Sequence, residues 1–295
     1  MKAAVLHKVG APFAIEGAPE PEGENVVDVR AAGINFADAL IRGGMYPQMP
    51  ELPYVPGSEV AGELDGRRVV AFTRGGGGFA ERAALDPDWT FDLPTGASFA
   101  AGAAFLTTYL TAYVPFSRLS FDSVLVHAGS GGVGTAAIQL AKHRGATVYA
   151  TASSDEKRAV ASKVGADHVL AYEAIDDLRV DIVIDPVGGD VFTRSLPLLN
   201  PLGTIVAIGF AGGLWQDPSV QWLVGRNASV MGVYLGRLLK LAPAFVRGCV
   251  EELLELWTMG AIDPVVGGTF PLAGINDAFA SIEQRRHVGK VVVEP

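Results

Sequence analysis

The chain has 295 residues and a mass of 30.9 kDa, a length typical of two domains. Hydrophobic residues make up 49% and charged residues 19%, a globular balance that excludes wholesale disorder. The formal charge of −9 argues against nucleic acid as the main partner, because an acidic chain repels phosphates. The single cysteine, Cys249, excludes an intramolecular disulfide and any zinc site with two or more thiolates. No apolar run reaches the roughly 20 residues that span a bilayer, so we expect a cytoplasmic protein without membrane contact.

The first 95 or so residues alternate short apolar runs with glycine and proline. Many short strands separated by such turns are typical of an antiparallel, barrel-like domain. The predicted strands are Lys2–Leu6, Asn25–Ala32, Glu59–Leu64, Arg67–Phe72 and Phe79–Leu85.

The pattern changes at Ser98, a plausible N-cap for an Ala/Leu-rich helical segment that reaches Phe116. Strand-like and helix-like segments alternate from there, and the strands are nearly continuous apolar runs. Such runs indicate strands buried on both faces of a parallel sheet, hence a doubly wound α/β domain. The predicted strands are Ser123–His127, Thr147–Thr151, Asp167–Ala171, Asp181–Asp185, Gly203–Ile208 and Ser229–Val233, and the predicted helices are Val133–Arg144, Asp155–Val164 and Gly189–Leu199.

The last part of the chain returns to the character of the first. A helical pattern over Leu238–Met259 is followed by short strands, a helix over Ile275–Gln284 and a final strand, Lys290–Val293. We therefore predict one domain from residues 1–97 plus 260–295 and a second from residues 98–259.

Residues 127–134 read HAGSGGVG, in which Gly129, Gly131 and Gly134 match G-x-G-x-x-G. The motif follows an apolar strand and opens a helix, the context that dinucleotide binding requires. If the loop binds a dinucleotide, Gly129 permits the tight turn and Gly131 lets the backbone approach the pyrophosphate. Gly134 lets the helix pack closely against the strand. The amides of Gly132 and Val133 at the helix N-terminus would face the phosphates. Alternatively, the segment is a glycine-rich turn between a strand and a helix that has only a structural role.

The same loop has a second interpretation. Ala128-x-Ser130-x-Gly132 resembles a nucleophile elbow without its first glycine, and Ser130, Asp185 and His287 follow the chain order of hydrolase triads. A serine hydrolase that uses Ser130 is therefore kept as an alternative, although Gly134 favours the nucleotide.

The segment after Thr151 bears on the choice of cofactor. NAD enzymes place an acid about 20 residues beyond the motif, where it binds the ribose 2′-hydroxyl. Here Ser153 and Ser154 stand at the strand tip and Lys157 follows. Hydroxyls and a cation suit a 2′-phosphate, so the sequence favours NADPH. Alternatively, Ser154 only caps a helix and Lys157 is solvated.

These features, with further segments, resemble the quinone oxidoreductase branch of the zinc-free medium-chain dehydrogenase/reductase superfamily, the branch that includes zeta-crystallin. The resemblance covers nearly the whole chain and implies a GroES-like β-rich domain interrupted by a Rossmann domain. It rests on AAGINFADALIRGGMYP (31–47), VPGSEVAGEL (55–64), LTTYLTAY (106–113), HAGSGGVGTAAIQLAK (127–142), GADHVLAY (165–172), DPVGGDVF (185–192), VAIGFAGG (206–213) and HVGKVVVEP (287–295).

The resemblance also implies roles for individual residues. The 2′-phosphate would meet Ser153, Ser154 and Lys157, with Tyr172 beside them. The nicotinamide end would meet Asn35, Thr111, Val233, Tyr234, Leu235 and Lys290. The adenosine or the nicotinamide ribose would meet Gly209, Phe210 and Ala211. Each of these residues could instead have a purely structural role. Asn35 could be a helix N-cap, Tyr172 a surface aromatic and Lys290 a solvated strand residue.

Zinc alcohol dehydrogenases of the superfamily carry a Cys and a His where this chain has Asn35 and Ser58. The resemblance therefore implies metal-free hydride transfer from NADPH to a quinone or an α,β-unsaturated carbonyl. Tyr46 is the best candidate for a substrate-facing hydroxyl, and Asn35 is the second catalytic candidate. Alternatively, Tyr46 is a loop aromatic packed on the core. Met45, Phe36 and Trp222 are candidates for an apolar wall.

Three other functions stay open: an enoyl-thioester reductase of the same fold, an NADPH-binding sensor or structural protein, and the hydrolase described above. The family commonly forms homodimers, and Ser229–Val233 is the candidate edge strand for the contact. His127 is expected to be a buried, hydrogen-bonded histidine, and Cys249 a core residue.

Overall fold

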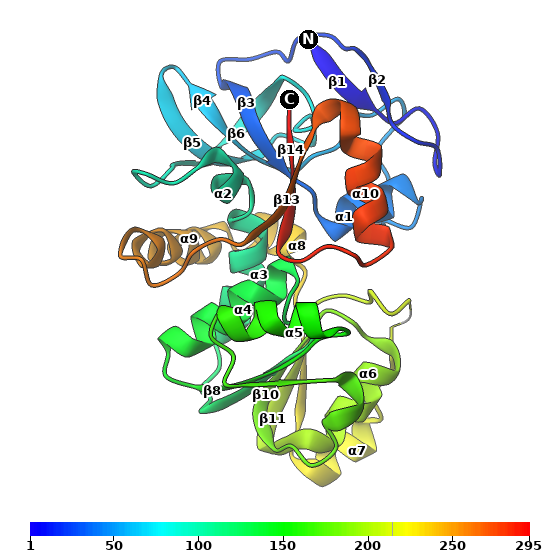
Figure 1. Cartoon of the computed structure of the whole chain (residues 1–295), viewed down its shortest axis with the longest axis vertical. Helices are drawn as coiled ribbons and strands as arrows, with labels where there is room; N and C mark the ends of the chain where they lie inside the picture. Colours follow the sequence, from blue (N-terminus) through cyan, green and yellow to red (C-terminus); the bar gives the residue numbers. More distant parts are fainter. Residues whose placement is uncertain (214) are drawn as a thin grey trace. The chain divides into compact units, whose positions relative to one another are not determined.

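The computed structural model describes residues 1–213 and 215–295, which form two compact units (Figure 1). Unit 1 comprises Met1–Thr107 and Asp263–Pro295, and unit 2 comprises Thr108–Ile262. The predicted interruption of the first domain by the second is thereby confirmed, because the two ends of the chain share unit 1.

Unit 1 is built on a six-stranded sheet of order β13-β14-β3-β4-β5-β6. Strand β3 also pairs with β6, which closes β3, β4, β5 and β6 into an antiparallel ring. The predicted barrel-like domain is confirmed. A separate hairpin is formed by β1 and β2. The strands are β1 (Lys2–Val5), β2 (Ala14–Gly17), β3 (Val26–Gly33), β4 (Glu59–Leu64), β5 (Arg67–Thr73), β6 (Arg82–Asp92), β13 (Val266–Pro271) and β14 (Lys290–Glu294).

The predicted strand Phe79–Leu85 differs from the observed β6, which starts three residues later and runs to Asp92. Phe79 and Ala80 are held by other partners. The amide of Phe79 donates to the carbonyl of Pro56, and Ala80 bridges to Ala3 in the N-terminal hairpin. Tertiary pairing thus decided where this strand begins.

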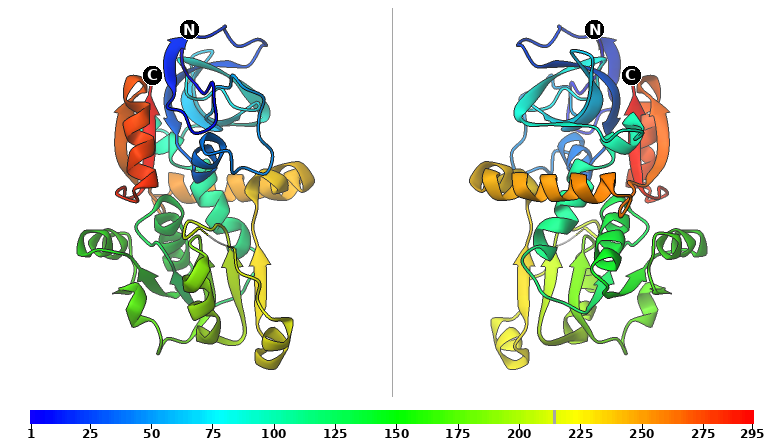
Figure 2. Two further views of the ribbon diagram at one scale, coloured as in Figure 1. Left: turned by 90° about the vertical axis from the view of Figure 1, so that its right-hand side faces the viewer. Right: turned by 90° about the vertical axis from the view of Figure 1, so that its left-hand side faces the viewer.

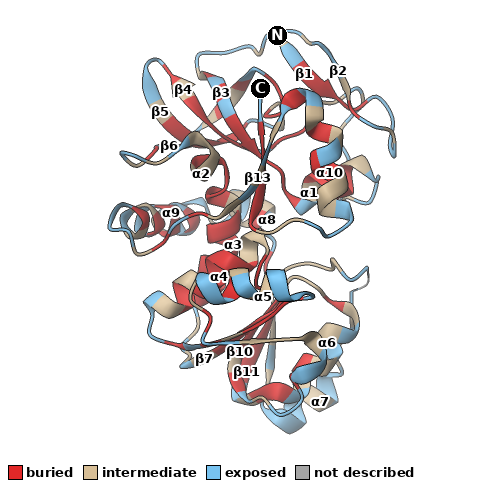
Figure 3. Cartoon of the chain, viewed as in Figure 1, coloured by how far each residue is buried: buried red, intermediate tan, exposed pale blue. Residues whose placement is uncertain are grey.

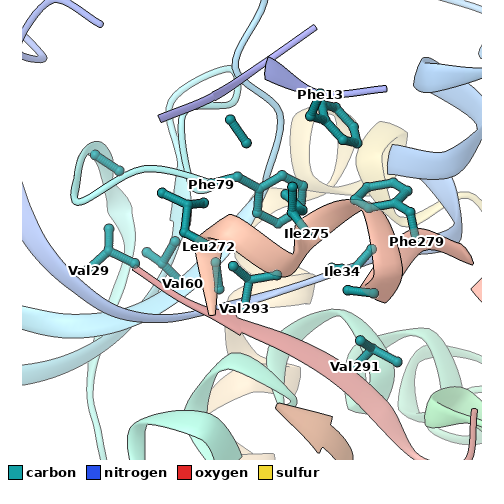
Figure 4. Packing of buried hydrophobic residues seen from close by; sticks show 14 of the residues in the cluster. Phe13, Val29, Ile34, Val60, Phe79, Leu272, Ile275, Phe279, Val291 and Val293 are labelled. Carbon is teal, nitrogen blue, oxygen red and sulfur yellow. The ribbon is translucent and has the colours of Figure 1, made fainter. Parts of the chain in front are cut away.

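The core of unit 1 joins both ends of the chain (Figure 4). The ring of Phe279, on α10 (Ile275–Glu283), lies 4.7 Å from the ring of Phe13 and 6.0 Å from that of Phe79. Val291 and Val293 of β14 belong to the same cluster. Their neighbours in the unit are α1 (Phe36–Arg42), α2 (Phe99–Ala103) and η3 (Leu272–Gly274).

Unit 2 carries a six-stranded parallel sheet of order β12-β11-β10-β7-β8-β9, with helices on both faces (Figure 2). The chain order reverses between β7 and β10. The inner strands are buried, as the apolar runs predicted (Figure 3). The strands are β7 (Ser123–Val126), β8 (Thr147–Thr151), β9 (His168–Leu170), β10 (Val180–Asp185), β11 (Leu199–Ala207) and β12 (Ser229–Gly232).

Two predicted helices are each divided into two in the structure. Ser98 caps α2 by accepting the amide of Ala101 at 3.1 Å, but the predicted helix to Phe116 is divided into α2 and α3. The predicted helix Leu238–Met259 breaks at Pro243, which has no amide to donate and therefore starts a new helix. The helices are α3 (Leu106–Phe116), α4 (Gly132–His143), α5 (Asp155–Lys163), α6 (Gly189–Ser195), α7 (Val220–Arg226), α8 (Leu235–Leu241) and α9 (Pro243–Thr258), with short turns η1 (Tyr172–Ala174) and η2 (Leu196–Leu198).

Candidate functional site

The predicted cofactor residues of unit 2 gather at one edge of its sheet. Because all six strands are parallel, the segments that follow their carboxyl ends meet at the same edge, and the strand order reverses there between β7 and β10, the position at which open α/β sheets bind ligands. The residues in question follow β7 (Gly129, Gly131, Gly132, Val133, Gly134), β8 (Ser153, Ser154, Lys157), β9 (Tyr172), β11 (Gly209, Phe210, Ala211) and β12 (Val233, Tyr234, Leu235).

The glycine loop is packed too tightly for side chains at two positions. A Cβ on Gly134 would lie 2.2 Å from the carbonyl oxygen of Ala128, and one on Gly129 would lie 2.9 Å from Cβ of Ala150. The residue with a positive φ is Ala128, at 50°, rather than any glycine of the motif. The loop leads directly into the twelve-residue helix α4, whose first amides point out of its N-terminus. This geometry fits a dinucleotide pyrophosphate.

A buried polar network lies beneath the loop. The hydroxyl of Ser195 donates to the carbonyl of Val191 at 2.7 Å, so it accepts from Nε2–H of His127, also at 2.7 Å. Nδ1 of His127 then accepts from the hydroxyl of Thr151 at 2.8 Å. Burial, and to a smaller extent Arg194, lowers the pKa of His127 to about 3, so the ring is neutral. The expected buried histidine is confirmed.

Tyr172 connects this network to the loop. Its ring stacks on His127 with centroids 5.8 Å apart and an interplanar angle of 17°, and its hydroxyl accepts the amide of Ala128 at 3.2 Å. The side chain is half-buried and supports the residue that carries the positive φ, and the contact of Tyr172 with the 2′-phosphate stays a prediction.

The candidate 2′-phosphate residues stand at the start of α5. Ser154 is its N-cap and accepts the amide of Lys157 at 3.3 Å, so the capping alternative is correct for Ser154. Its hydroxyl proton remains available for another acceptor. Ser153 and Ser154 are exposed and Lys157 is half-buried. Arg158 instead binds the carboxylate of Asp155 at 2.5 Å and the carbonyl of Ala152 at 3.3 Å.

The segments after β10 and β11 are fixed to each other. Oδ1 of Asp185 accepts the amides of Val187 and Gly188 at 2.8 and 3.0 Å, while Oδ2 is buried without a partner among the described residues. Burial raises the pKa of this carboxyl. The amide of Ala211 donates to the carbonyl of Pro186 at 3.1 Å. Ser130 and Asp185 belong to unit 2 and His287 to unit 1, so the triad of the hydrolase alternative stays a prediction.

The remaining candidates of unit 2 flank the same edge or lie on α3. The amide of Val233 donates to the carbonyl of Ala207 at 3.0 Å, and Val233 and Leu235 are buried while Tyr234 between them is exposed. Thr111 is buried on α3. The ring of Phe210 lies 4.9 Å from that of Trp215.

Unit 1 contains a second buried polar cluster, of Asn35, Asp38, Ser58, Glu59 and Lys290. Nζ of Lys290 donates to Oδ1 of Asn35 at 2.5 Å and forms an ion pair with Oε1 of Glu59. Nδ2 of Asn35 donates to the hydroxyl of Ser58 at 3.4 Å and to Oε1 of Glu59 at 3.3 Å. Lys290 is only 4% exposed, so its interpretation as a solvated strand residue is wrong.

Asp38 and Glu59 are functional candidates that the sequence analysis missed. Asn35 is the N-cap of α1, as its alternative reading predicted, and its amide donates to Oδ2 of Asp38 at 2.8 Å. Burial raises the pKa of Asp38 to about 6, against the lowering effects of the amide of Asn35 and the charge of Lys290. The available signals were an acid three residues after a capping Asn, and one acid within the apolar run of β4.

Tyr46 packs half-buried against the apolar cluster of unit 1, which agrees with its alternative as a loop aromatic on the core. Phe36 and Met45, in the same unit, are exposed, whereas Trp222 belongs to α7 of unit 2. The apolar wall and the catalytic role of Tyr46 stay predictions. Within residues 1–213 and 215–295, no group of three His, Cys, Asp or Glu side chains could hold a metal ion, and no helix is long and apolar enough to cross a membrane.

A barrel-like unit interrupted by a doubly wound unit with a glycine loop at its strand reversal defines the GroES–Rossmann class of dehydrogenases and reductases. Residues 21–67 match the alcohol dehydrogenase GroES-like domain family, and residues 132–256 match the zinc-binding dehydrogenase family. The chain belongs to the quinone oxidoreductase branch of the zinc-free medium-chain dehydrogenase/reductase superfamily. It is an oxidoreductase that binds a nicotinamide cofactor and acts on a small molecule.

Three relatives carry this assignment. A quinone oxidoreductase-like protein 2 homolog of Nematostella vectensis is 32% identical over 99% of this chain and 88% of that protein. The synaptic vesicle membrane protein VAT-1 homolog of Homo sapiens is 34% identical over 94% of this chain and 80% of that protein. The quinone oxidoreductase of Thermus thermophilus, solved also with NADPH, is 36% identical, has a TM-score of 0.89 and matches both chains over 100% of their length.

Proposed function

We propose that the protein is an NADPH-dependent reductase that transfers a hydride to a quinone or an α,β-unsaturated carbonyl without a metal. The observation that carries the proposal is the carboxyl edge of the parallel sheet. There the tight glycine loop, the exposed serines after β8 and the segments after β11 and β12 meet around one strand reversal. Relatives named as quinone oxidoreductases support the acceptor class.

Different residues at this edge would bind different parts of the cofactor. The amides of Gly132 and Val133 would hold the pyrophosphate, because they are the first amides of α4 and have no helical acceptor. Ser153, Ser154 and Lys157 would hold the 2′-phosphate. The nearest acid, Asp155, is turned outward and paired with Arg158, so it does not oppose a phosphate at the strand tip.

A further group of residues is proposed to bind the nicotinamide end of the cofactor and the acceptor. Bound NADPH supplies the hydride, and the chain orients the ring, excludes water and binds the acceptor. Asn35 and Tyr46 are proposed to touch the acceptor or the nicotinamide. The other residues proposed at this end are Thr111, Gly209, Phe210, Ala211, Val233, Tyr234, Leu235 and Lys290, with Tyr172 nearer the adenosine.

The test is the oxidation of NADPH and of NADH with 1,4-benzoquinone, 9,10-phenanthrenequinone, a 2-alkenal and an enoyl thioester, each against an enzyme-free blank. We expect turnover with NADPH preferred. Turnover with the thioester alone would indicate an enoyl-thioester reductase, and tight NADPH binding without turnover would indicate a sensor. Absence of NADPH binding would contradict the proposal.

We also propose a cytoplasmic homodimer formed through β12. This strand is the last of the parallel sheet, pairs only with β11 among the described residues and is partly exposed. Light scattering after size exclusion should report twice the chain mass. A species of 30.9 kDa alone would contradict the dimer.

A further inference from the structure

The ammonium of Lys290 has a hydrogen-bond donor that the protein does not use. An ammonium carries three N–H donors. Two of them reach Oδ1 of Asn35 and Oε1 of Glu59, which are its only acceptors in the described chain. With 4% of the residue exposed, solvent reaches little of the group. A nearly buried cationic donor without an acceptor is costly, which is typical of a position where a ligand completes the bonding.

The two partners hold the ammonium in one place. Glu59 is fully buried, and its second oxygen, Oε2, accepts the amide of Thr107 at 2.8 Å. The amide nitrogen of Asn35 is committed to Ser58 and Glu59, so its oxygen must face Lys290. Because both acceptors are anchored elsewhere, the third N–H of Lys290 has a fixed direction.

Gly33 on β3 makes room for the lysine stem. A Cβ at this position would lie 2.0 Å from the carbonyl oxygen of Ala103, 2.7 Å from Oε1 of Glu59 and 2.9 Å from Cε of Lys290. Gly33 is the register partner of Val292, so the stem of Lys290 is set by the pairing of β14 with β3. The ammonium of Lys290 is thus held in place by the paired strands β14 and β3 rather than by a mobile loop, so its position is preorganised.

We propose that Lys290 is a catalytic residue whose third N–H binds the carbonyl oxygen of the acceptor and stabilises the negative charge that collects there. The proposal rests on the proposed function and deepens it, because it names an oxygen acceptor that becomes an anion as the substrate class. A fixed cation in a poorly solvated site interacts with a developing oxyanion far more strongly than it would in water.

The reaction balances as a two-electron reduction. An α,β-unsaturated carbonyl gains a hydride at its β-carbon from the reduced nicotinamide, its C=C electron pair shifts, and the carbonyl oxygen becomes an enolate oxyanion. A proton from solvent then adds at the α-carbon, and the cofactor is left oxidised. A quinone correspondingly becomes a hydroquinone monoanion that solvent protonates. Lys290 keeps its proton throughout and acts through its charge and its N–H.

The test removes both charges of the buried pair together. Lys290→Met with Glu59→Gln removes both members of the ion pair, and the carboxyl of Asp38 keeps the amide of Asn35 as its donor, so the variant should fold, which its thermal melt checks. Lys142→Met is the control, because Lys142 is a partly exposed lysine paired with Asp167 in unit 2. We expect the kcat for an enone to fall about 100–1000-fold in the double variant, as for a lost oxyanion donor, with the Kd for NADPH within about twofold.

A second readout does not depend on turnover. In the presence of NADP⁺, 4-nitrophenol is a mimic of the hydroquinone monoanion, and its absorbance reports the bound phenolate. The unmodified protein and Lys142→Met should bind the phenolate with the apparent pKa of the phenol lowered by about one unit, a tenfold preference. The double variant should lose that preference. The variant Lys290→Arg should retain part of it, because the charge remains.

Three results would overturn the proposal for Lys290. One is kcat within about threefold of the unmodified value in a folded double variant. Another is a phenolate preference that survives the substitution. The last is a loss of activity matched by an equal rise in the Kd for NADPH, which would make Lys290 a ligand of the nicotinamide carboxamide instead. Failure of the proposed function is distinguishable, because the unmodified protein would then fail to bind or oxidise NADPH.

Discussion

The two units each contain a buried polar cluster, and the clusters differ in charge. In unit 1 the cluster joins Asn35, Glu59 and Lys290 around an ion pair. In unit 2 the cluster of Thr151, His127 and Ser195 is neutral, since every ring nitrogen and hydroxyl is matched and the pKa of His127 is lowered to about 3. A neutral network is sufficient to hold a loop in position. A buried ion pair is costly to form, so the cluster of unit 1 depends on both of its charges in a way that the neutral cluster does not.

The largest expected effect is the loss of one partner of the ion pair. Glu59→Ala leaves the ammonium of Lys290 buried with one acceptor, and should lower the free energy of unfolding by ~3–5 kcal/mol in urea denaturation. The double variant Glu59→Gln, Lys290→Met should lose much less. Equal losses in the two variants would mean that the charges do not depend on each other.

A smaller loss of stability is expected when the neutral cluster loses one member. Ser195→Ala removes the acceptor of Nε2–H of His127, which should cost ~1–3 kcal/mol, because an uncharged donor is left unsatisfied. Urea denaturation of Ser195→Ala and Glu59→Ala under the same conditions compares the two losses of unfolding free energy directly. A cost for Ser195→Ala as large as that for Glu59→Ala would remove the contrast between the clusters.

The glycine loop above the neutral cluster should respond to added volume. Gly134→Ala would place a Cβ 2.2 Å from the carbonyl oxygen of Ala128, so the loop must shift, at ~1–3 kcal/mol. We expect a Kd for NADPH raised about tenfold or more by fluorescence titration. Gly248→Ala is the matched control, since its Cβ would meet nothing within 4 Å on α9. Unchanged NADPH binding in Gly134→Ala would contradict the pyrophosphate assignment.

The 2′-phosphate assignment predicts a selective effect. Lys157→Met should raise the Kd for NADPH about tenfold, or ~1.4 kcal/mol, and leave the Kd for NADH unchanged, because only NADPH carries the phosphate. The exposed Lys163 at the other end of α5 provides the control variant, Lys163→Met. An equal rise for both cofactors would place Lys157 elsewhere.

The clusters also predict opposite dependences of stability on pH. The native pKa of His127, about 3, lies below its unfolded value of 6.5, so its stabilising contribution is present above 6.5 and is lost as the pH falls. The native pKa of Asp38, about 6, lies above its unfolded value of 3.8, so its contribution is present below 3.8 and is lost as the pH rises through 6.

Between about pH 4 and 6 these two slopes oppose each other, each at about 1 kcal/mol per pH unit. Relative to the unmodified protein, Asp38→Asn should lose stability more steeply as the pH falls from about 6 to 4, and His127→Gln should lose it less steeply. Urea denaturation at three pH values measures both slopes. Parallel curves for all three proteins would show that neither group titrates as described.

Much of the fold followed from local sequence pattern. The strand Glu59–Leu64 was predicted with its observed bounds, because apolar residues between turn-forming residues determine a strand wherever it pairs. The glycine loop was recognisable because its motif lies within eight consecutive residues, between an apolar strand and a helix. The N-caps at Ser98 and Ser154 were recognisable for the same reason, since a cap and its amide are three residues apart.

The charged cluster of unit 1 was recognised only in part. Asn35 and Lys290 were singled out by resemblance, but Asp38 and Glu59 were not, and Lys290 could equally be read as a solvated residue. Their common environment depends on the pairing of β14 with β3, which brings together residues separated by 255 positions. Long-range pairing of the same kind, between Ala80 and Ala3, accounts for the later start of β6.

The sequence by itself therefore determined the class of fold, the family and the loop that suits a dinucleotide, since these depend on periodicity and on short motifs. Only the tertiary structure decided which polar groups are buried, which are charged and which donor is left for a ligand. Burial and charge pairing are properties of surfaces that meet in space, and neighbouring residues in the chain do not reveal them.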